Sequence, residues 1–211
     1  MAPDSKANAS DEKTVMNSIL APFNPSSDQI QQKAMDLLVN PLMADPSTLA
    51  PGPVLFDLGC GDARLLIACA KKYPSLRCVG VEIDQVFANR AIENIKGLPE
   101  IYDRIYIHQQ DAHTLPMTTP QASRFRISDL TLIDDADALY LFVLPKGIEK
   151  LMPILTAVLE RRKNEGRNFR ILSYMFKLKE WEPTLIDRTT KGSCPIYLYD
   201  FLFTSSELDS K

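Results

Sequence analysis

The sequence has few of the residues that build metal centres and disulfide frameworks. It holds four cysteines, two histidines and one tryptophan among 211 residues, and no two cysteines form a C-x-x-C pair. Cys60, Cys69 and Cys78 fall in a glycine turn, a predicted helix and a predicted strand, where a free thiol acts as a small apolar side chain. We therefore expect no metal and no disulfide, and a reducing compartment, the cytoplasm or the nucleus.

Long apolar runs and a strong charge of one sign are also missing. No run approaches the roughly 20 apolar residues that a membrane helix needs. The first twenty residues mix Asp4, Asp11 and Glu12 with Lys6 and Lys13, unlike a signal or transit peptide. The net charge of −3 gives no electrostatic reason for nucleic-acid binding. We expect neither a membrane nor a nucleic acid as partner.

Two short charged runs are interpreted as solvated surface. Residues 161–163, RRK, form the only compact basic run and lie at the end of a predicted helix, where cations are favourable against the helix dipole. Asp134, Asp135 and Asp137 could suggest a cation site, but Ala136 and a following strand separate them awkwardly, which favours a solvated loop.

Length and patterning predict one domain. The chain can bury one sizeable core, so a mobile extension at residues 1–14 and a single domain at 15–211 are expected. Helical patterns separate the first five predicted strands, and no helix separates the last two. This order predicts an α/β three-layer sandwich around a mostly parallel seven-stranded sheet with an antiparallel last strand. The predicted strands are 54–58, 77–81, 104–108, 138–144, 169–175, 185–190 and 196–203.

A helix is also predicted ahead of the first strand. Ser26-x-x-Gln29 has the pattern of a capping box, and apolar residues follow it at helical spacing. Asn40-Pro41 is expected to begin the connection from this helix into the core.

The most informative stretch is residues 53–64, PVLFDLGCGDAR. A buried strand ends there at Gly59-Cys60-Gly61, where missing side chains let the backbone turn sharply and approach a ligand. Asp62 is a plausible N-cap for the next helix. The second strand ends at Glu82, close to the position of the acidic residue that binds ribose hydroxyls in a βαβ nucleotide fold.

The charges around this turn indicate which kind of cofactor it holds. A nicotinamide fingerprint would need a small residue at Arg64, and Asp57 and Asp62 would repel a pyrophosphate. Asp57-x-Gly59-x-Gly61 instead suits a ligand that carries an ammonium group and a sulfonium.

DLGCGDAR followed by VGVEID resembles the first two cofactor motifs of the Rossmann-like (class I) S-adenosylmethionine-dependent methyltransferases. The resemblance implies that Gly59 and Gly61 underlie the methionine part of the cofactor, Asp57 lies near its ammonium group and Glu82 holds the ribose. In this family a carboxylate at the end of the third strand binds the adenine amino group, and Asp111 fits that role. The cofactor contacts implied by the resemblance also include Cys60, Ile83 and Ala112.

Further segments extend the similarity from about Pro22 to Phe203: PFNPSS, LYLFVLPKGIEKLMPIL, SYMFKLKEWEP and IYLY. Together they resemble a subgroup of small bacterial methyltransferases and eukaryotic lysine methyltransferases that act on mitochondrial carrier and ATP-synthase subunits. The resemblance implies that Ser26 touches the cofactor carboxylate. Two departures stand out. Ala63 replaces the usual third glycine, and the missing membrane anchor argues against a membrane-embedded target.

The resemblance predicts a methyltransferase (EC 2.1.1) that acts on a protein lysine amine. A small-molecule N- or O-methyltransferase and a non-catalytic cofactor-binding subunit are the alternatives. Methyl transfer needs alignment and the exclusion of water rather than a covalent residue, so no catalytic base is assigned. Tyr140 and Phe142 are interpreted as core residues, and the candidates for the wall of the acceptor cleft are Tyr174, Trp181 and Pro145.

Overall fold

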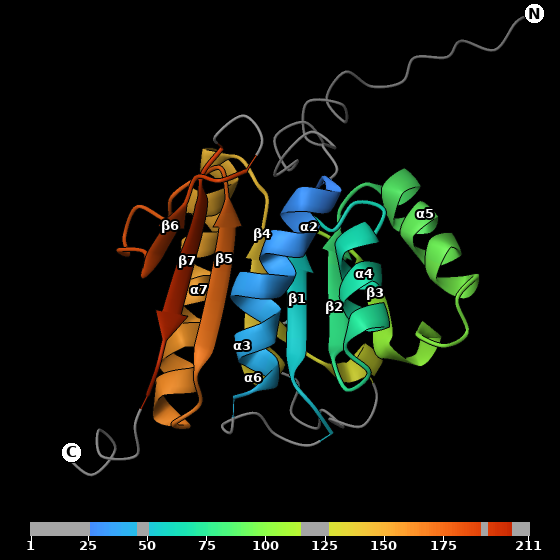
Figure 1. The fold of residues 1–211 in the computed structure, drawn as a ribbon, viewed down its shortest axis with the longest axis horizontal. Helices are drawn as coiled ribbons and strands as arrows, with labels where there is room; N and C mark the ends of the chain where they lie inside the picture. The colour runs from blue at the N-terminus through green and yellow to red at the C-terminus, as the bar shows by residue number, and fades with distance from the viewer. Residues whose placement is uncertain (1–25, 46–50, 115–126, 191–193, 204–211) are drawn as a thin grey trace, which may run out of the picture.

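The computed structural model describes residues 26–45, 51–114, 127–190 and 194–203. The predicted extension at residues 1–14 lies outside this set. Seven strands form one sheet in the order β3-β2-β1-β4-β5-β7-β6 (Figure 1). Their bounds are β1 Val54–Leu58, β2 Arg77–Glu82, β3 Ile105–Gln109, β4 Ala138–Leu141, β5 Phe169–Tyr174, β6 Leu185–Asp187 and β7 Ile196–Phe201.

The first five strands are parallel, and β7 runs antiparallel to both β5 and β6. The predicted seven-stranded sheet with an antiparallel last strand is confirmed. Every residue of β1 is buried, as expected for an unbroken apolar run in the middle of a covered parallel sheet. Strand β4 ends at Leu141, earlier than predicted, because the chain then turns toward a helix that begins at Pro145.

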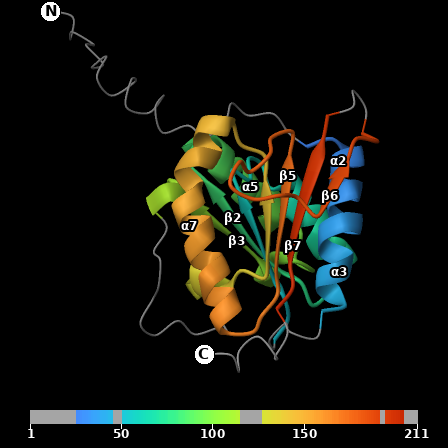
Figure 2. The same ribbon diagram turned by 90° about the vertical axis from the view of Figure 1, so that its left-hand side faces the viewer.

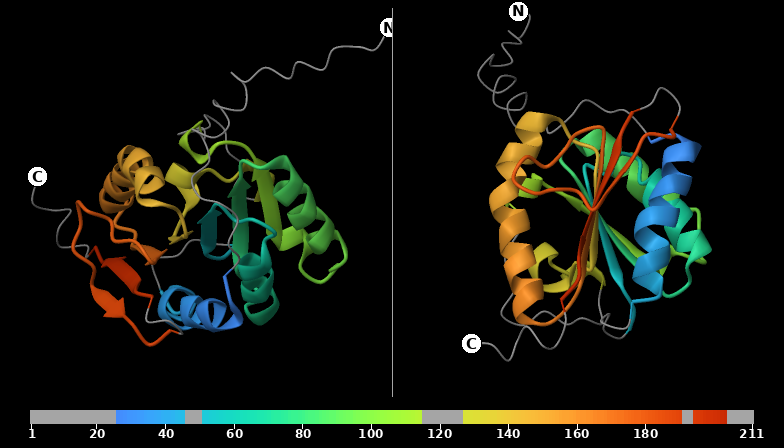
Figure 3. Two further views of the ribbon diagram at one scale, coloured as in Figure 1. Left: turned by 90° about the horizontal axis from the view of Figure 1, so that it is seen from above. Right: turned by 60° about the vertical axis from the view of Figure 1, so that its left-hand side comes forward.

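Helices cover both faces of the sheet, which confirms the predicted three-layer sandwich (Figures 2 and 3). Successive residues of β1 point to opposite faces, so Leu55 and Phe56 belong to different core clusters. No helix in the described part of the chain is long and apolar enough to cross a membrane. One face carries α2 Asp28–Ala34, α3 Asn40–Met43, α4 Arg64–Lys72 and α5 Gln85–Lys96, and the other carries α6 Leu132–Asp135 and α7 Pro145–Asn164.

The start of α2 differs from the predicted capping box by one residue. Ser27 is the N-cap, and its hydroxyl accepts the N–H of Ile30 at 3.4 Å. The amide of Gln29 donates instead to the carbonyl of Thr189 at 3.4 Å. The hydroxyl of Ser26 therefore has no capping role.

The chain also stays helical where a connection is predicted. A π-helical turn at Met35–Val39 leads from α2 into α3, and Asn40 is the first residue of α3. Pro41 lies inside this continuous helical stretch, directly after the π-helical turn, where a proline removes one backbone hydrogen bond.

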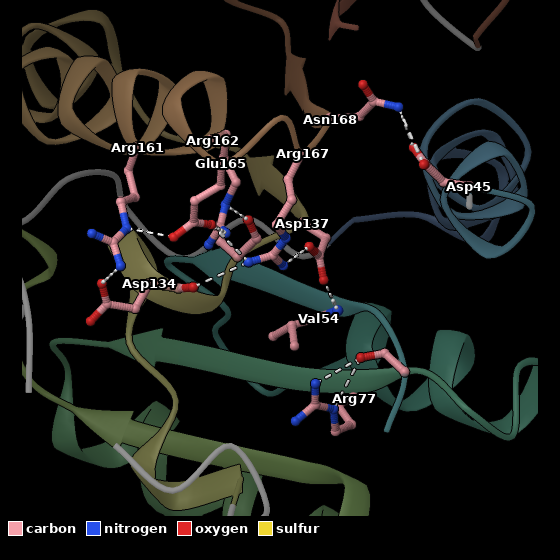
Figure 4. Close-up of polar contacts among 12 residues, drawn as sticks. Asp45, Val54, Arg77, Asp134, Asp137, Arg161, Arg162, Glu165, Arg167 and Asn168 are labelled. Atoms are coloured by element: carbon pink, nitrogen blue, oxygen red, sulfur yellow. Dashed lines mark hydrogen bonds and ion pairs between the residues drawn. The ribbon is translucent and has the colours of Figure 1, made fainter. Parts of the chain in front are cut away.

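The two charged runs lie side by side, and their interpretation as solvated surface is wrong for Arg162, Asp135 and Asp137, which are buried (Figure 4). Arg161 and Lys163 are exposed, as predicted. Arg162, near the end of α7, has no exposed surface, and Asp135 and Asp137 are each 3% exposed. Arg162 donates to the carbonyl of Ala136 and to the carboxylate of Glu165, both at 2.8 Å. These partners make the burial of a guanidinium tolerable.

A second buried arginine ties α7 to the start of two strands. Arg167 pairs with the carboxylate of Asp137, just before β4, and the other oxygen of Asp137 accepts the N–H of Val54 at 2.9 Å. Arg170 at the start of β5 pairs with Asp45 in the same way. Buried ion pairs therefore hold the edge of the sheet where the parallel strands begin. The opposite edge, where they end, is where open α/β sheets bind ligands.

Candidate active site

The site lies at the carboxyl ends of β1 and β4. Strand β1 leads through α4 to β2 on one side, whereas β4 leads through α7 to β5 on the other. Connections that leave in opposite directions open a crevice above the two strands, the usual position for a ligand in such sheets. The predicted glycine turn follows β1 at this point.

The glycine turn has a backbone that glycine makes possible. Gly59 has φ of 90° and Gly61 of 57°, both in the left-handed region. The N–H groups of Gly59 and Cys60 donate to the carbonyl of Val81 at 2.8 and 3.1 Å, which joins the turn to β2. Burial raises the pKa of the Cys60 thiol, so it is a packing residue and not a nucleophile.

The first residues of α4 correct one prediction. Ala63 is the N-cap and adopts φ of 63°, a conformation that costs a non-glycine residue roughly 1–2 kcal/mol. Asp62 lies one residue before the N-cap, and its Oδ1 accepts the N–H of Arg64, the first residue of α4, at 3.4 Å. Its carboxylate binds the side chain of Arg64 at 2.6 Å, and this hydrogen bond lowers the pKa of Asp62. The third-glycine position thus keeps a left-handed backbone even with alanine.

Glu82, at the end of β2, supports the glycine turn from the side. Its Oε2 accepts the N–H of Gly61 at 2.8 Å, and its Oε1 accepts the N–H of Asp84 at 2.9 Å. Asp84 in turn caps α5 through hydrogen bonds to Val86 and Phe87. Ile83 lies half-buried between the two acidic residues.

Asp57 is a buried carboxylate without a matching cation. It is 3% exposed, and no hydrogen bond or ion pair to its side chain is found within the described residues. Burial, reinforced by the negative charge of Glu82, raises the pKa of Asp57 to about 8. Such a group gains most from a ligand that brings a positive charge. The buried carboxylate of Asp57 therefore makes the site suitable for a cofactor that carries an ammonium group.

The end of β3 brings Asp111 to the same edge of the sheet. Its Oδ1 accepts the backbone N–H of His113 at 3.0 Å and lies 2.6 Å from the Nδ1 of the same residue. Ala112 between them is buried. The Nε2 atoms of Gln110 and His113 are buried and have no hydrogen-bond partner.

Ser26 reaches the site from the N-terminal side. Its hydroxyl lies 2.8 Å from the hydroxyl of Tyr140 in β4, and both residues are buried. Tyr140 is the register partner of Asp57 in the neighbouring strand. The sequence indicated Tyr140 only as a core residue. Its burial agrees with that interpretation, but its hydroxyl group also holds the N-terminal segment.

The acceptor candidates do not all gather in one place. Tyr174 ends β5, and its ring packs against Phe142 with centroids 4.8 Å apart. Pro145 begins α7 at the same edge of the sheet. The structure places Trp181 elsewhere, edge-on to Phe201 at 5.2 Å. Phe201 pairs with Phe169, the first residue of β5, so this tryptophan lies toward the opposite end of the strands.

The described residues contain no group of three His, Cys, Asp or Glu side chains arranged to hold a metal ion. The site instead combines a buried acidic strand end, a left-handed glycine turn and two further carboxylates on neighbouring strands.

Comparisons with known proteins agree with this geometry. Residues 51–128 match the model of a family described as "Putative methyltransferase". The chain is 23% identical over 180 residues to a protein-lysine N-methyltransferase of Saccharolobus islandicus, an alignment that covers 84% of this chain and 92% of the relative.

Two solved structures have the same fold. An RNA methyltransferase of Salinibacter ruber in complex with S-adenosyl-L-homocysteine superposes with a TM-score of 0.60 at 23% identity, covering 89% of this chain and all of the other. A precorrin-6y C5,15-methyltransferase of Geobacter metallireducens superposes with a TM-score of 0.52 at 16% identity, covering 89% and 95%. The predicted Rossmann-like methyltransferase fold is confirmed, and this one fold serves several kinds of acceptor.

Proposed function

We propose that this chain, a Rossmann-like S-adenosylmethionine-dependent methyltransferase, transfers its methyl group to a lysine side chain of a protein. The observation that carries the enzyme class is the unpaired, buried Asp57 beside the left-handed glycine turn. The lysine acceptor is supported by the near full-length similarity to the Saccharolobus islandicus enzyme. RNA and small-molecule methyltransferases share the fold, so the acceptor needs a direct test.

Three carboxylates, each at the end of a different strand, would bind three different parts of the cofactor. We propose that Asp57 binds the ammonium group, Glu82 the ribose hydroxyls and Asp111 the adenine amino group, while Gly59 and Gly61 pass beneath the methionine part. When bound, S-adenosylmethionine supplies an activated methyl group on its sulfonium. The similar Salinibacter ruber structure contains S-adenosyl-L-homocysteine, which supports S-adenosylmethionine as the cofactor.

The acceptor wall is apolar and aromatic. A lysine amine must be neutral to attack, and an apolar surface lowers its pKa by desolvation. The Phe142–Tyr174 pair offers such a surface at the end of β5. Burial, with a smaller effect from Cys194, raises the pKa of Tyr174, so its phenol stays neutral and can accept a hydrogen bond from the amine.

The two alternative functions require different sets of residues. A non-catalytic subunit has no need for Asp57, Glu82 and Asp111 together at one edge of the sheet. A small-molecule methyltransferase uses the same cofactor set, so only the acceptor separates it from the proposal.

Methyl transfer from labelled S-adenosylmethionine into a cell lysate separated by size tests the acceptor. We expect label in the protein fraction, sensitive to protease and resistant to ribonuclease, and released as methyllysine on acid hydrolysis. A Glu82→Ala variant, whose cofactor binding should be weakened, serves as the control and should incorporate less label. Label confined to small molecules, or label lost on ribonuclease treatment, would contradict the lysine proposal while keeping the enzyme class.

A further inference from the structure

The hydrogen bond between Ser26 and Tyr140 joins parts of the chain that are far apart in sequence. Its hydroxyl oxygens lie 2.8 Å apart, and Tyr140 is 2% exposed. A buried hydroxyl pair costs free energy unless both groups are satisfied, so each fixes the other. Tyr140 comes from β4 in the centre of the sheet, and Ser26 comes just before α2. The bond therefore fixes Ser26, at the start of α2, against the central strand β4.

Tyr140 lies beside the carboxylate that the cofactor is proposed to need. Its register partner in β1 is Asp57. Leu55 and Tyr140 belong to the same core cluster, and Asp57, two residues after Leu55, points to that same face of the sheet. Neighbouring strands are roughly 4.8 Å apart. The side chain of Tyr140 thus starts at the strand position beside Asp57 and reaches the hydroxyl of Ser26.

Other contacts hold the segment on its outer side. The amide of Gln31 donates to the carbonyl of Ser26 at 3.0 Å, and Lys33 pairs with Asp187 of β6 at 2.7 Å. These contacts lie along α2 and at the far edge of the sheet. Only the Ser26–Tyr140 bond among them reaches the strand next to Asp57.

We propose that Tyr140 is a positioning residue that holds Ser26 over the amino-acid end of the cofactor, so that the enzyme distinguishes the complete cofactor from one that lacks its ammonium and carboxylate groups. This inference rests on the proposed function, since it needs the cofactor but not the lysine acceptor. Tyr140 acts through Ser26 and has no part in the displacement itself. Its role is to favour ligands that carry the amino-acid group.

The inference predicts a change in ligand preference and not merely in stability. The probes are S-adenosylhomocysteine, which has the amino-acid group, and methylthioadenosine, which lacks it. In calorimetric titrations, Tyr140→Phe and Ser26→Ala should each lower the affinity for S-adenosylhomocysteine by about five- to tenfold. This is the usual effect of one lost hydrogen bond. Both variants should bind methylthioadenosine within about twofold of the parent. The double variant should lose no more than Ser26→Ala alone, because Tyr140 acts only through Ser26.

Tyr199→Phe provides a matched control. Tyr199 is 1% exposed, and its hydroxyl accepts the N–H of Leu178 at 2.7 Å, but it belongs to the core cluster on the other face of the sheet. This variant should lower the thermal unfolding temperature without altering the ratio of the two affinities. The control separates the general effect of losing a buried tyrosine hydroxyl from the specific effect of losing the hydroxyl of Tyr140.

The possible outcomes are distinct. Equal weakening of both ligands by Tyr140→Phe, or unchanged affinity for both, would overturn the inference. Failure of the parent to bind S-adenosylhomocysteine would overturn the proposed function itself. Loss of preference in Tyr140→Phe and Ser26→Ala but not in Tyr199→Phe supports the inference.

Discussion

Glu82 Oε2 accepts the backbone N–H of Gly61 at 2.8 Å, so the last residue of β2 holds the turn that follows β1. Through Oε1 it also holds the N–H of Asp84 at the start of α5. One carboxylate therefore shapes the glycine turn and is also the group proposed to bind the ribose hydroxyls. The two roles make this residue the most exacting test of the site.

Glu82→Ala should weaken S-adenosylmethionine binding by about tenfold or more, since it removes a ligand group and leaves two backbone donors without an acceptor. The unpaired donors should also cost about 1–3 kcal/mol in the free energy of unfolding. Calorimetry and urea denaturation measure the two effects. Glu82→Gln keeps one acceptor oxygen and should fall between the parent and the alanine variant. Unchanged affinity in Glu82→Ala would remove Glu82 from the site.

Asp57→Asn should change stability and affinity in opposite directions. The pKa of Asp57 rises from 3.8 to about 8 on folding. Its contribution to stability is fully present below about pH 4 and is lost as the pH rises toward 8. At neutral pH this carboxyl must take up a proton on folding, a cost that an amide avoids, so the variant should unfold a few degrees higher. It should also bind S-adenosylmethionine at least about tenfold more weakly. A variant that is both less stable and equally able to bind would contradict the assignment.

The affinity of the parent should depend on pH through the same group. A cationic ligand favours the ionised carboxylate, which is the minor form below the pKa of about 8. Between about pH 6 and pH 7.5 the dissociation constant should fall by at most about tenfold per pH unit, because the proton must leave as the ligand binds. Calorimetry in buffers of different ionisation enthalpy should detect that proton. Asp57→Asn should show a flat profile over this range.

Tyr174→Phe should slow methyl transfer to the acceptor without changing the affinity for the cofactor. The ring contact with Phe142 is kept, but the hydroxyl proposed to accept a hydrogen bond from the amine is lost. We expect a lower kcat, by about three- to tenfold, with the dissociation constant of S-adenosylmethionine unchanged. Steady-state methyl transfer and calorimetry report the two quantities. A loss of cofactor affinity instead would place Tyr174 on the other side of the site.

Arg162→Ala should destabilise the protein without touching the site. The substitution leaves the buried carbonyl of Ala136 without its donor, whereas the carboxylate of Glu165 keeps Arg161 and Arg167 as partners. A buried acceptor left unpaired in this way typically costs about 1–3 kcal/mol. The folded fraction should bind S-adenosylmethionine with parental affinity, because the cluster lies at the edge where the parallel strands begin. Urea denaturation with and without cofactor tests both statements.

The elements were predictable where one local pattern decides them. Strand β1 and the glycine turn depend on an apolar run and on two glycines in sequence, and both lie where the sequence predicts them. The N-caps of α2 and α4 were not predictable, because Ser26 and Asp62 each bind another side chain more closely than a helix N–H. Tyr140 attracts Ser26 from 114 residues away, and Arg64 binds Asp62 through its guanidinium.

Long-range pairing explains the other differences. The basic run at 161–163 reads as a solvated helix end, yet Arg162 is buried because Glu165 and the chain before β4 surround it. Trp181 has polar neighbours in sequence, which favours a cleft position, but Phe201 provides an aromatic partner at the other end of the sheet. Local composition carries no information about either partner. The acidic strand ends, in contrast, follow from topology and meet at one edge as predicted.

A calorimetric titration of S-adenosylmethionine into the parent protein, with NAD as the comparison ligand, tests the central claim most directly. The account predicts saturable binding of S-adenosylmethionine at one site per chain and no binding of the dinucleotide. No heat from S-adenosylmethionine, or saturable binding of NAD in its place, would contradict it.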